Sequence, residues 1–215
     1  MVQKELPKAH IGVPTLGPRD GSFGRPGLMA APLVELTQRL GGRIADIEAV
    51  AARGMKVLPN LITILGMGTD YNKACALACM IKMAESGTDC REAVHALREL
   101  LASKNEYVKG YAATLLGTMK DEKSIPEIAK GLGDKSHIIR WRCADALEAL
   151  GAASVPELLK ALDGKNERAG REAGKILPRL ANAFPGCVPA DAIERISRTE
   201  REQIVRNSYG SLRME

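Results

Sequence analysis

Apolar residues in the second half of the chain recur at the spacing of one face of an α-helix. Between residues 138 and 151 they stand three or four positions apart, and the same spacing returns between residues 154 and 164. Each stretch therefore predicts an amphipathic helix. The two apolar stripes consist of Ile139, Cys143, Ala146, Leu147 and Leu150, and of Val155, Leu158, Leu159 and Leu162. Neither helix can bury its stripe alone, so we expect neighbouring helices to stack.

The same two kinds of helix recur along the chain. The segment SIPEIAKGLGD at residues 124–134 matches SVPELLKALDG at residues 154–164, and an earlier copy, VLPNLITILG, lies at residues 57–66. The helices between the proline copies, EYVKGYAATLLGTM and IIRWRCADALEALG, also align with each other, and RAGREAGKILPRLA is a weaker third copy. The repeating unit is therefore predicted to be a pair of helices.

The start of each later proline helix carries a capping signal. Ser124 with Glu127, and Ser154 with Glu157, match the S-x-x-E capping box, in which both side chains satisfy backbone N–H groups of the first turn. A proline follows inside that turn, where its missing N–H costs little. These pairs predict helix starts at Ser124 and Ser154.

The repeated residues resemble a known repeat. The pattern D-x-x-x-[IV]-[RK]-x-x-[AC]-A-x-[AL]-L, seen at residues 136–147 and 104–116 and followed by a capped proline helix, is similar to HEAT-like repeats of the phycobilisome-lyase type. The resemblance covers residues 44–182 and implies an all-α fold, a right-handed α-solenoid of about five helical hairpins. Units are expected near residues 44–66, 71–102, 105–133, 136–163 and 166–197.

The aspartate of that pattern is displaced or replaced in this chain. The residues concerned are Asp134 and Asp163, which are displaced, and Asn105 and Asn166, which replace it. We therefore expect the Asp–Arg ladder that the resemblance implies between repeats to be less regular here.

The chain is expected to have three parts. Residues 1–27 are rich in proline and glycine and predict an extended arm, either an irregular tail or a docking peptide for a partner. Residues 28–200 form the repeat domain, with a helix at residues 28–40 as its first cap. Residues 201–215 form a charged C-terminal tail.

Composition narrows the class of protein. Hydrophobic residues make up 45% of the 215 residues, charged residues 27% and aromatic residues only 3%, a balance typical of a soluble globular chain. A core with so few rings favours close helix packing over a β-sandwich or barrel. The net charge of +5 permits an acidic partner without requiring one.

Cysteine use and apolar stretches bear on location. The five cysteines are odd in number and include no C-x-x-C pair, which favours a reducing cytoplasm. The N-terminus lacks the apolar segment of a signal peptide, and the longest apolar stretch, residues 57–67, is too short to cross a bilayer. We therefore expect a cytoplasmic protein without a membrane partner.

Candidate metal and catalytic residues are sparse. Cys75 and Cys79 stand four positions apart, but a structural zinc site needs four ligands, so we interpret them as small core residues. None of His10, His95 and His137 is followed by glutamate, which a resemblance to HEAT-type di-iron hydroxylases would require. No phosphate-binding loop, dinucleotide fingerprint or nucleophile elbow is present. We expect no catalytic residue, metal or cofactor, and favour a protein that is not an enzyme while leaving that question open.

These features favour a binding function. We expect a non-enzymatic adaptor or scaffold that holds a protein partner on a concave surface lined by the proline helices. Because a stacked array loses little conformational entropy on binding, many weak polar contacts can give useful affinity. The expected contact residues are Asn60, Thr63, Arg98, Glu127, Lys130, Glu157 and Lys160.

Two alternatives stay open. Trp141 and Asp145 share a helix face, and the alkylpurine DNA glycosylases built of HEAT-like repeats use such a pair to hold and cleave a damaged nucleotide, which would imply a nucleic-acid site here. Its candidate residues are Arg140, Trp141, Asp145 and Arg171. Charges alternate along the proline helices, which disfavours a phosphate-binding groove. The second alternative, implied by the phycobilisome-lyase resemblance, is a bilin lyase-like subunit, although a shared fold does not by itself carry function.

Overall fold

The computed structural model describes residues 44–198, and every regular element in that range is a helix. The longer helices are α2 (Ile44–Ala51), α3 (Leu58–Met67), α4 (Asp70–Glu85), α5 (Val94–Leu100), α6 (Glu106–Thr118), α7 (Ile125–Lys130), α8 (His137–Leu150), α9 (Val155–Leu162) and α10 (Glu167–Ala183), and residues 190–198 are also helical. Short 3₁₀ turns stand between them at η2 (Gly54–Lys56), η3 (Arg91–Ala93), η4 (Glu122–Ser124), η5 (Gly131–Gly133) and η6 (Gly151–Ser154). Within residues 44–198, none of the helices has the length and apolar character needed to traverse a bilayer.

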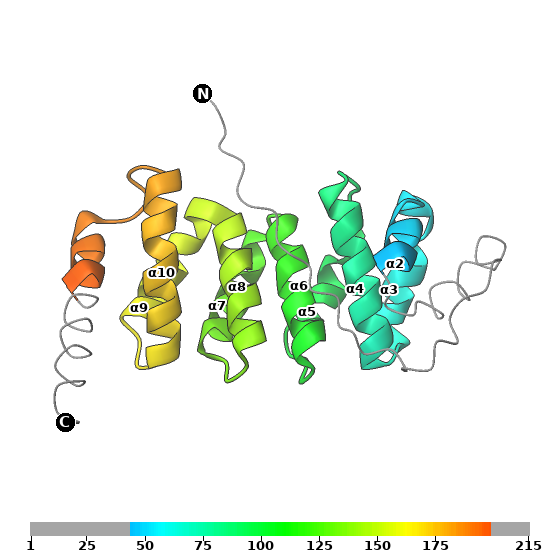
Figure 1. Ribbon diagram of the computed structural model, residues 1–215, viewed down its shortest axis with the longest axis horizontal. Coiled ribbons are helices and arrows are strands. Elements are labelled where there is room, and N and C mark those ends of the chain that lie inside the picture. The colour runs from blue at the N-terminus through cyan, green and yellow to red at the C-terminus, as the bar shows by residue number, and fades with distance from the viewer. Residues whose placement is uncertain (1–43, 199–215) are drawn as a thin grey trace, which may run out of the picture.

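The helices stack in chain order into an elongated array (Figure 1). Each shorter helix packs against the longer helix that follows it, in the pairs α3 with α4, α5 with α6, α7 with α8, and α9 with α10. The predicted all-α solenoid is confirmed over the described residues. The predicted units divide the same array differently, because each begins with the longer helix and ends with the shorter helix that follows it.

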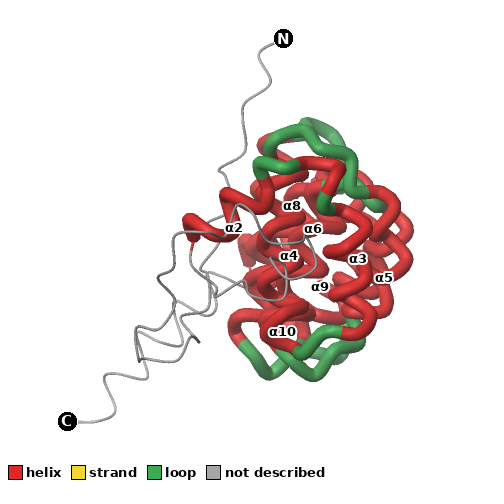
Figure 2. Tube along the Cα trace, turned by 90° about the vertical axis from the view of Figure 1, so that its right-hand side faces the viewer, coloured by secondary structure: helices red, strands yellow, loops and turns green. Residues whose placement is uncertain are grey.

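The array has two layers that differ in spacing. Viewed along the array, the longer helices α4, α6 and α8 lie in one layer, and the shorter helices α3 and α5 lie in the other (Figure 2). The helix α6 contacts both α4 and α8 along much of its length, whereas α8 meets α10 at only a few residues, as successive short helices do. From α4 to α8, the layer of long helices is therefore the more closely spaced of the two.

The predicted capping boxes are wrong. Ser124 and Ser154 have helical backbone angles, with φ of −87° and −81°, because each ends a 3₁₀ turn, whereas a capping residue is extended. The hydroxyl of Ser124 bonds to the carboxylate of Asp121 instead, and that of Ser154 donates to the carbonyl oxygens of Leu147 and Gly151. The serines therefore fasten the turns that precede the helices.

Asparagines supply caps where the repeat pattern has aspartate. Asn105 is extended, and its side-chain oxygen accepts hydrogen bonds from the amides of Tyr107 and Val108 at 3.0 and 3.2 Å. Asn166 caps α10 in the same way. Such caps satisfy amides that the first turn would otherwise leave unpaired, so the replaced positions still start the long helices.

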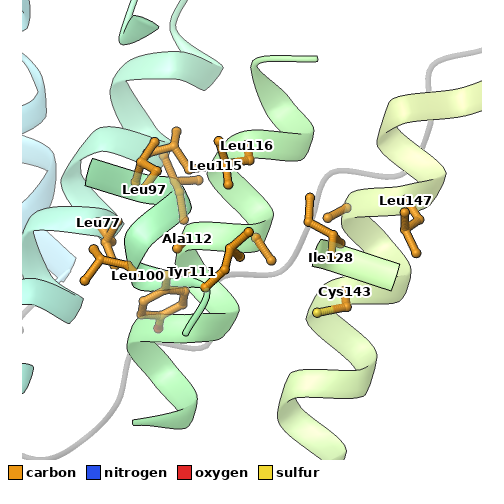
Figure 3. Packing of buried hydrophobic residues seen from close by; sticks show 14 of the residues in the cluster. Leu77, Leu97, Leu100, Tyr111, Ala112, Leu115, Leu116, Ile128, Cys143 and Leu147 are labelled. Carbon is orange, nitrogen blue, oxygen red and sulfur yellow. The ribbon is translucent and has the colours of Figure 1, made fainter. Parts of the chain in front are cut away.

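A continuous apolar core runs between the layers. Leu97 from α5 and Leu115 from α6 are among the buried residues that join neighbouring helices, as are Ile128 from α7 and Leu147 from α8 (Figure 3). The predicted stripe on α8 is buried throughout, whereas only the first two residues of the stripe on α9 are buried. The core that the periodicity predicted is therefore present, although α9 contributes less than expected.

The turn η5 closes tightly against α8 at Gly131. A Cβ atom there would collide with the sulfur of Cys143. Cys143 is 1% exposed, and burial raises the pKa of its thiol to about 12. Glycine is needed at this position because only a hydrogen atom fits between the turn and the helix.

Several predicted segments lie outside the described residues. They are the arm at residues 1–27, the cap helix at residues 28–40 with the start of the repeat domain, the tail at residues 201–215, and His10. The domain limits predicted there stay predictions.

Candidate partner-binding surfaces

The contact residues predicted on the proline helices lie in one layer, and four of them pair with each other. On α7, the Lys130 Nζ atom lies 2.6 Å from Glu127 Oε1. On α9, the Lys160 Nζ atom lies 2.5 Å from Glu157 Oε1. The remaining predicted residues are Asn60 and Thr63 on α3 and Arg98 on α5. Consecutive repeats therefore present the same Glu–Lys pair at the same helix position.

Arg98 ties α5 to the next proline helix instead of pointing freely to solvent. Its guanidinium contacts Asp121 at 2.5 Å, and its Nε atom lies 3.2 Å from the hydroxyl of Ser124. Burial alone would raise the pKa of Asp121, but the hydrogen bonds from Arg98 and Ser124, together with the charge of Arg98, lower it. The Arg98 side chain is therefore part of a junction between repeats.

The two displaced aspartates form similar links between repeats. The Lys109 Nζ atom on α6 lies 2.9 Å from Asp134 Oδ2, just before α8. The Arg195 Nη1 atom lies 2.6 Å from Asp163 Oδ1, just after α9. Neighbouring repeats are thus joined by ion pairs as well as by apolar packing, which restricts their relative motion.

A guanidinium that the sequence analysis missed is buried between two aromatic rings in the layer of long helices. Arg142 on α8 is 3% exposed, and its Cζ atom lies 4.9 Å from the ring centre of Tyr111 on α6 and 4.6 Å from that of Trp141. The stem of Arg142 passes Gly110, where a Cβ would approach its Cγ atom to 3.0 Å. Its Nη1 atom is buried without a hydrogen-bond partner, and burial lowers the pKa of the guanidinium. Cation–π contacts therefore stabilise this charge in place of an ion pair.

Asp145 lies one turn beyond Trp141 and is half-buried. Within residues 44–198 it makes neither a hydrogen bond nor an ion pair. Burial raises the pKa of its carboxyl group, Glu148 raises it further, and Arg142 and Arg179 oppose these effects. Glu148 itself is paired, because its Oε1 atom lies 2.6 Å from the Arg179 Nη1 atom. The charge of Asp145 is therefore compensated only in part, by two arginines that form no ion pair with it among residues 44–198.

The two arginines of the predicted nucleic-acid site are engaged by neighbouring groups. Arg140 donates to two backbone carbonyl oxygens before α8, each at 2.9 Å, and its Nε atom lies 3.9 Å from Glu172. Arg171 lies 3.9 Å from Glu167. An open depression of about 560 Å³ at the start of α10 is lined by Lys165, Asn166, Glu167, Arg168 and Arg171. Of the four predicted residues, Trp141 and Asp145 share one face of α8, whereas both arginines face carboxylates.

The cysteines of α4 lie in the core. Cys75 and Cys79 are 2% and 0% exposed. Among the described residues, no three His, Cys, Asp or Glu side chains stand together as ligands for a metal ion. Burial also raises the pKa of Cys90, to about 11, and the charge of Asp89 adds to the shift. Such a thiol is a poor nucleophile at neutral pH.

Comparison with known proteins identifies the repeat. The family model for HEAT repeats matches residues 94–177. Two engineered proteins of known structure are each 20% identical to this chain, with TM-scores of 0.49, and the alignments cover 82% and 81% of this chain and 80% and 47% of theirs. A designed armadillo repeat protein in complex with the peptide (KR)4 is 16% identical, with a TM-score of 0.44, and the alignment covers 84% of this chain and 88% of that one. None of the curated proteins matches the chain.

The family match spans the hairpins from α5 to α10, where the repeated sequence is clearest. The predicted resemblance to HEAT-like repeats is confirmed, whereas its narrower assignment to the phycobilisome-lyase type is not. Residues 94–177 are therefore HEAT-like repeats.

Proposed function

We propose that this protein is a non-enzymatic scaffold that binds a protein partner on its layer of long helices. In a curved two-layer array, the more closely spaced layer lies on the inner side. The close contacts between α4, α6 and α8 therefore support the long helices, and not the proline helices, as the concave side. The seven residues predicted on the proline helices stay a prediction for a second, outer surface.

The observation that carries this proposal is the exposure of Trp141. It is the only tryptophan of the chain and is 38% exposed, and Arg142 lies against its ring. Tryptophan is enriched among the residues that dominate binding energy at protein interfaces, and a ring held in one orientation loses little entropy on binding. An exposed tryptophan in a chain with so few aromatic residues supports a contact role.

The ion pairs between repeats support the same function. The contacts of Arg98 with Asp121 and of Lys109 with Asp134 fix neighbouring repeats before any partner arrives. A partner then meets a preformed surface, so less free energy is lost to ordering the scaffold.

The test is affinity capture followed by quantitative mass spectrometry, with full-length protein as bait in a lysate of the source organism. Four baits are compared: the wild type, Trp141→Ala, Met67→Ala and the double variant Lys130→Glu/Lys160→Glu. Met67 is 83% exposed on α3, so its truncation is the matched control for loss of an exposed apolar side chain.

We expect a partner that is captured by the wild type, Met67→Ala and the double variant but not by Trp141→Ala. Loss of the partner in the double variant alone would move the site to the proline helices. If no captured protein depends on either surface, the scaffold proposal fails.

One observation supports the nucleic-acid alternative: three basic residues line the depression at the start of α10. Strongly salt-dependent binding of duplex DNA would support it, and a flat response at low salt would remove it. If the purified protein is colourless and does not react with bilins, the bilin lyase-like alternative is excluded.

A further inference from the structure

Two neighbouring side chains on α8 are complementary to a cation. Trp141 and Asp145 stand one helical turn apart, so they project from the same face. We propose that they form a binding site for a cationic side chain, arginine or lysine, of a protein partner. The inference deepens the proposed function and rests on it only for the claim that the cation belongs to a protein.

The charge accessible at this site is negative. Arg142 is positive, but at 3% exposure it is covered, and its charge lies against the rings of Tyr111 and Trp141. Glu148 is neutralised by Arg179 at 2.6 Å. An approaching group therefore meets the half-buried carboxylate of Asp145, which attracts cations and repels phosphates.

The tryptophan ring supplies the second half of the site. The electron-rich face of an indole attracts cations within about 6 Å of its centre, and arginine does so most often. Arg142 already lies against the ring at 4.6 Å, which fixes its orientation. The part of Trp141 that stays exposed is available to a second guanidinium or ammonium group from outside.

Asp145 gains a missing partner when a cation binds. Half-buried and without an ion pair in the described structure, its carboxylate has lost part of its hydration without receiving a compensating contact. The raised pKa of this group is consistent with that penalty. An arginine or lysine that stacks on Trp141 can reach the carboxylate one turn away, which removes the penalty.

Other ligand classes fit less well. A metal ion would need several ligands, and no suitable group of three occurs among residues 44–198. An anion would reach Arg142 only if the covering ring moved, because the Nη1 atom is buried. A cationic side chain needs no rearrangement of the site.

The experiment uses the fluorescence of Trp141, which reports on this site alone because the chain has no other tryptophan. The full-length protein is titrated with the peptide acetyl-(Gly-Arg)4-amide, and in parallel with acetyl-(Gly-Glu)4-amide and with duplex DNA. We expect a saturable fluorescence change with the arginine peptide only. In Asp145→Asn the dissociation constant should rise about tenfold, since one charged contact is lost.

The matched control is Glu92→Gln, which removes one negative charge from an exposed residue of η3 and leaves α8 intact. It should bind the arginine peptide as the wild type does, and circular dichroism verifies that both variants fold. Equal weakening in the two variants would mean attraction by overall charge and would overturn the inference. So would a response to DNA or to the glutamate peptide in place of the arginine peptide, or no response at all.

The scaffold proposal and the cation site can fail independently, and the two experiments distinguish these failures. If affinity capture finds no partner while the arginine peptide still binds in an Asp145-dependent manner, the cation site stands and the scaffold proposal fails. If a partner is lost in Trp141→Ala but retained at full strength in Asp145→Asn, the scaffold stands and the cation site fails.

Discussion

The junction that joins α5 to α7 and the junction that joins α6 to α8 contain charges in very different surroundings. At the first junction, Arg98 lies 2.5 Å from Asp121 and also donates a hydrogen bond to the hydroxyl of Ser124. At the second junction, Arg142 lies against two aromatic rings, and within residues 44–198 its Nη1 atom has no hydrogen-bond partner and Asp145 makes no ion pair. The two junctions belong to the same repeat type, yet their charges are compensated to different degrees.

The difference in charge compensation distinguishes positions that stabilise the array from positions that are candidates for binding. A matched charge pair gains nothing further from an external ligand, so its role is to hold the repeats together. An incompletely compensated charge lowers the stability of the free protein and is relieved when a complementary group arrives. The face of α8 is therefore a better candidate than the Arg98–Asp121 junction for binding a complementary group.

The largest effect is expected at the matched junction. Asp121→Ala should lower the free energy of unfolding by about 1–2 kcal/mol, because it leaves the buried hydroxyl of Ser124 without its acceptor. Urea unfolding followed by circular dichroism measures this loss. Asp145→Ala is the matched control and should show no comparable destabilisation.

At the junction between α6 and α8, removing the charge of Arg142 should raise the free energy of unfolding or leave it unchanged. Arg142→Met keeps an unbranched apolar side chain against Gly110 and should leave stability unchanged or raise it by about 1 kcal/mol, since an unpaired buried cation is lost. A loss above about 2 kcal/mol in urea unfolding would show that the cation–π contacts outweigh the burial penalty. The emission of Trp141 should shift in either case because its neighbour changes.

The pH dependence of stability should differ in sign between the two carboxylates. The pKa of Asp121 is lowered below 3.8, so its contribution is present above that value and is lost as the pH falls through its folded-state pKa. The pKa of Asp145 is raised above 3.8 by burial and by Glu148, with Arg142 and Arg179 opposing, so its charged form is unfavourable until the pH falls through the raised value.

Asp145→Asn should therefore be more stable than the wild type at pH 7. The gain should be less than about 1 kcal/mol because solvent partly screens a half-exposed group. The difference should shrink once the pH approaches 3.8. Urea unfolding at a series of pH values measures it, and a constant difference across the series would contradict the assigned shift.

The smallest effect is expected on the proline helices. Lys130→Ala and Lys160→Ala should each change stability by no more than about 0.5 kcal/mol, because both ammonium groups are 71% exposed and their pairs with glutamate are screened by water. Thermal unfolding monitored by circular dichroism is sufficient. Unequal effects at the two sites would show that the repeated pairs are not equivalent.

The sequence predicted the fold well where apolar spacing repeated. The segments at residues 124–134 and 154–164 do form proline helices, because burial of one apolar stripe leaves a short amphipathic segment few alternatives. The capping boxes failed for a local reason. The pattern S-x-x-E does not distinguish an extended cap from a serine such as Ser124 that ends a 3₁₀ turn.

Only part of the candidate site could be predicted from the sequence. The shared face of Trp141 and Asp145 followed from their spacing on one helix. The burial of Arg142 did not, because it depends on Gly110 in the preceding repeat, which leaves space for the stem. The repeat alignment contained the signal, since a glycine stands in α6 where α8 has its tryptophan, and a missing side chain between closely packed helices admits a long one from the neighbour.

Because Gly131 lies so close to Cys143, the reactivity of this thiol measures how often the turn η5 separates from α8. With a pKa of about 12 and 1% exposure, the thiol is sealed while the turn stays seated, so a thiol-reactive dye can label it only during excursions that lift η5 from α8. The labelling rate of Cys143 would then report how often this hairpin opens at η5. A partner that bound across η5 and α8 would slow this labelling.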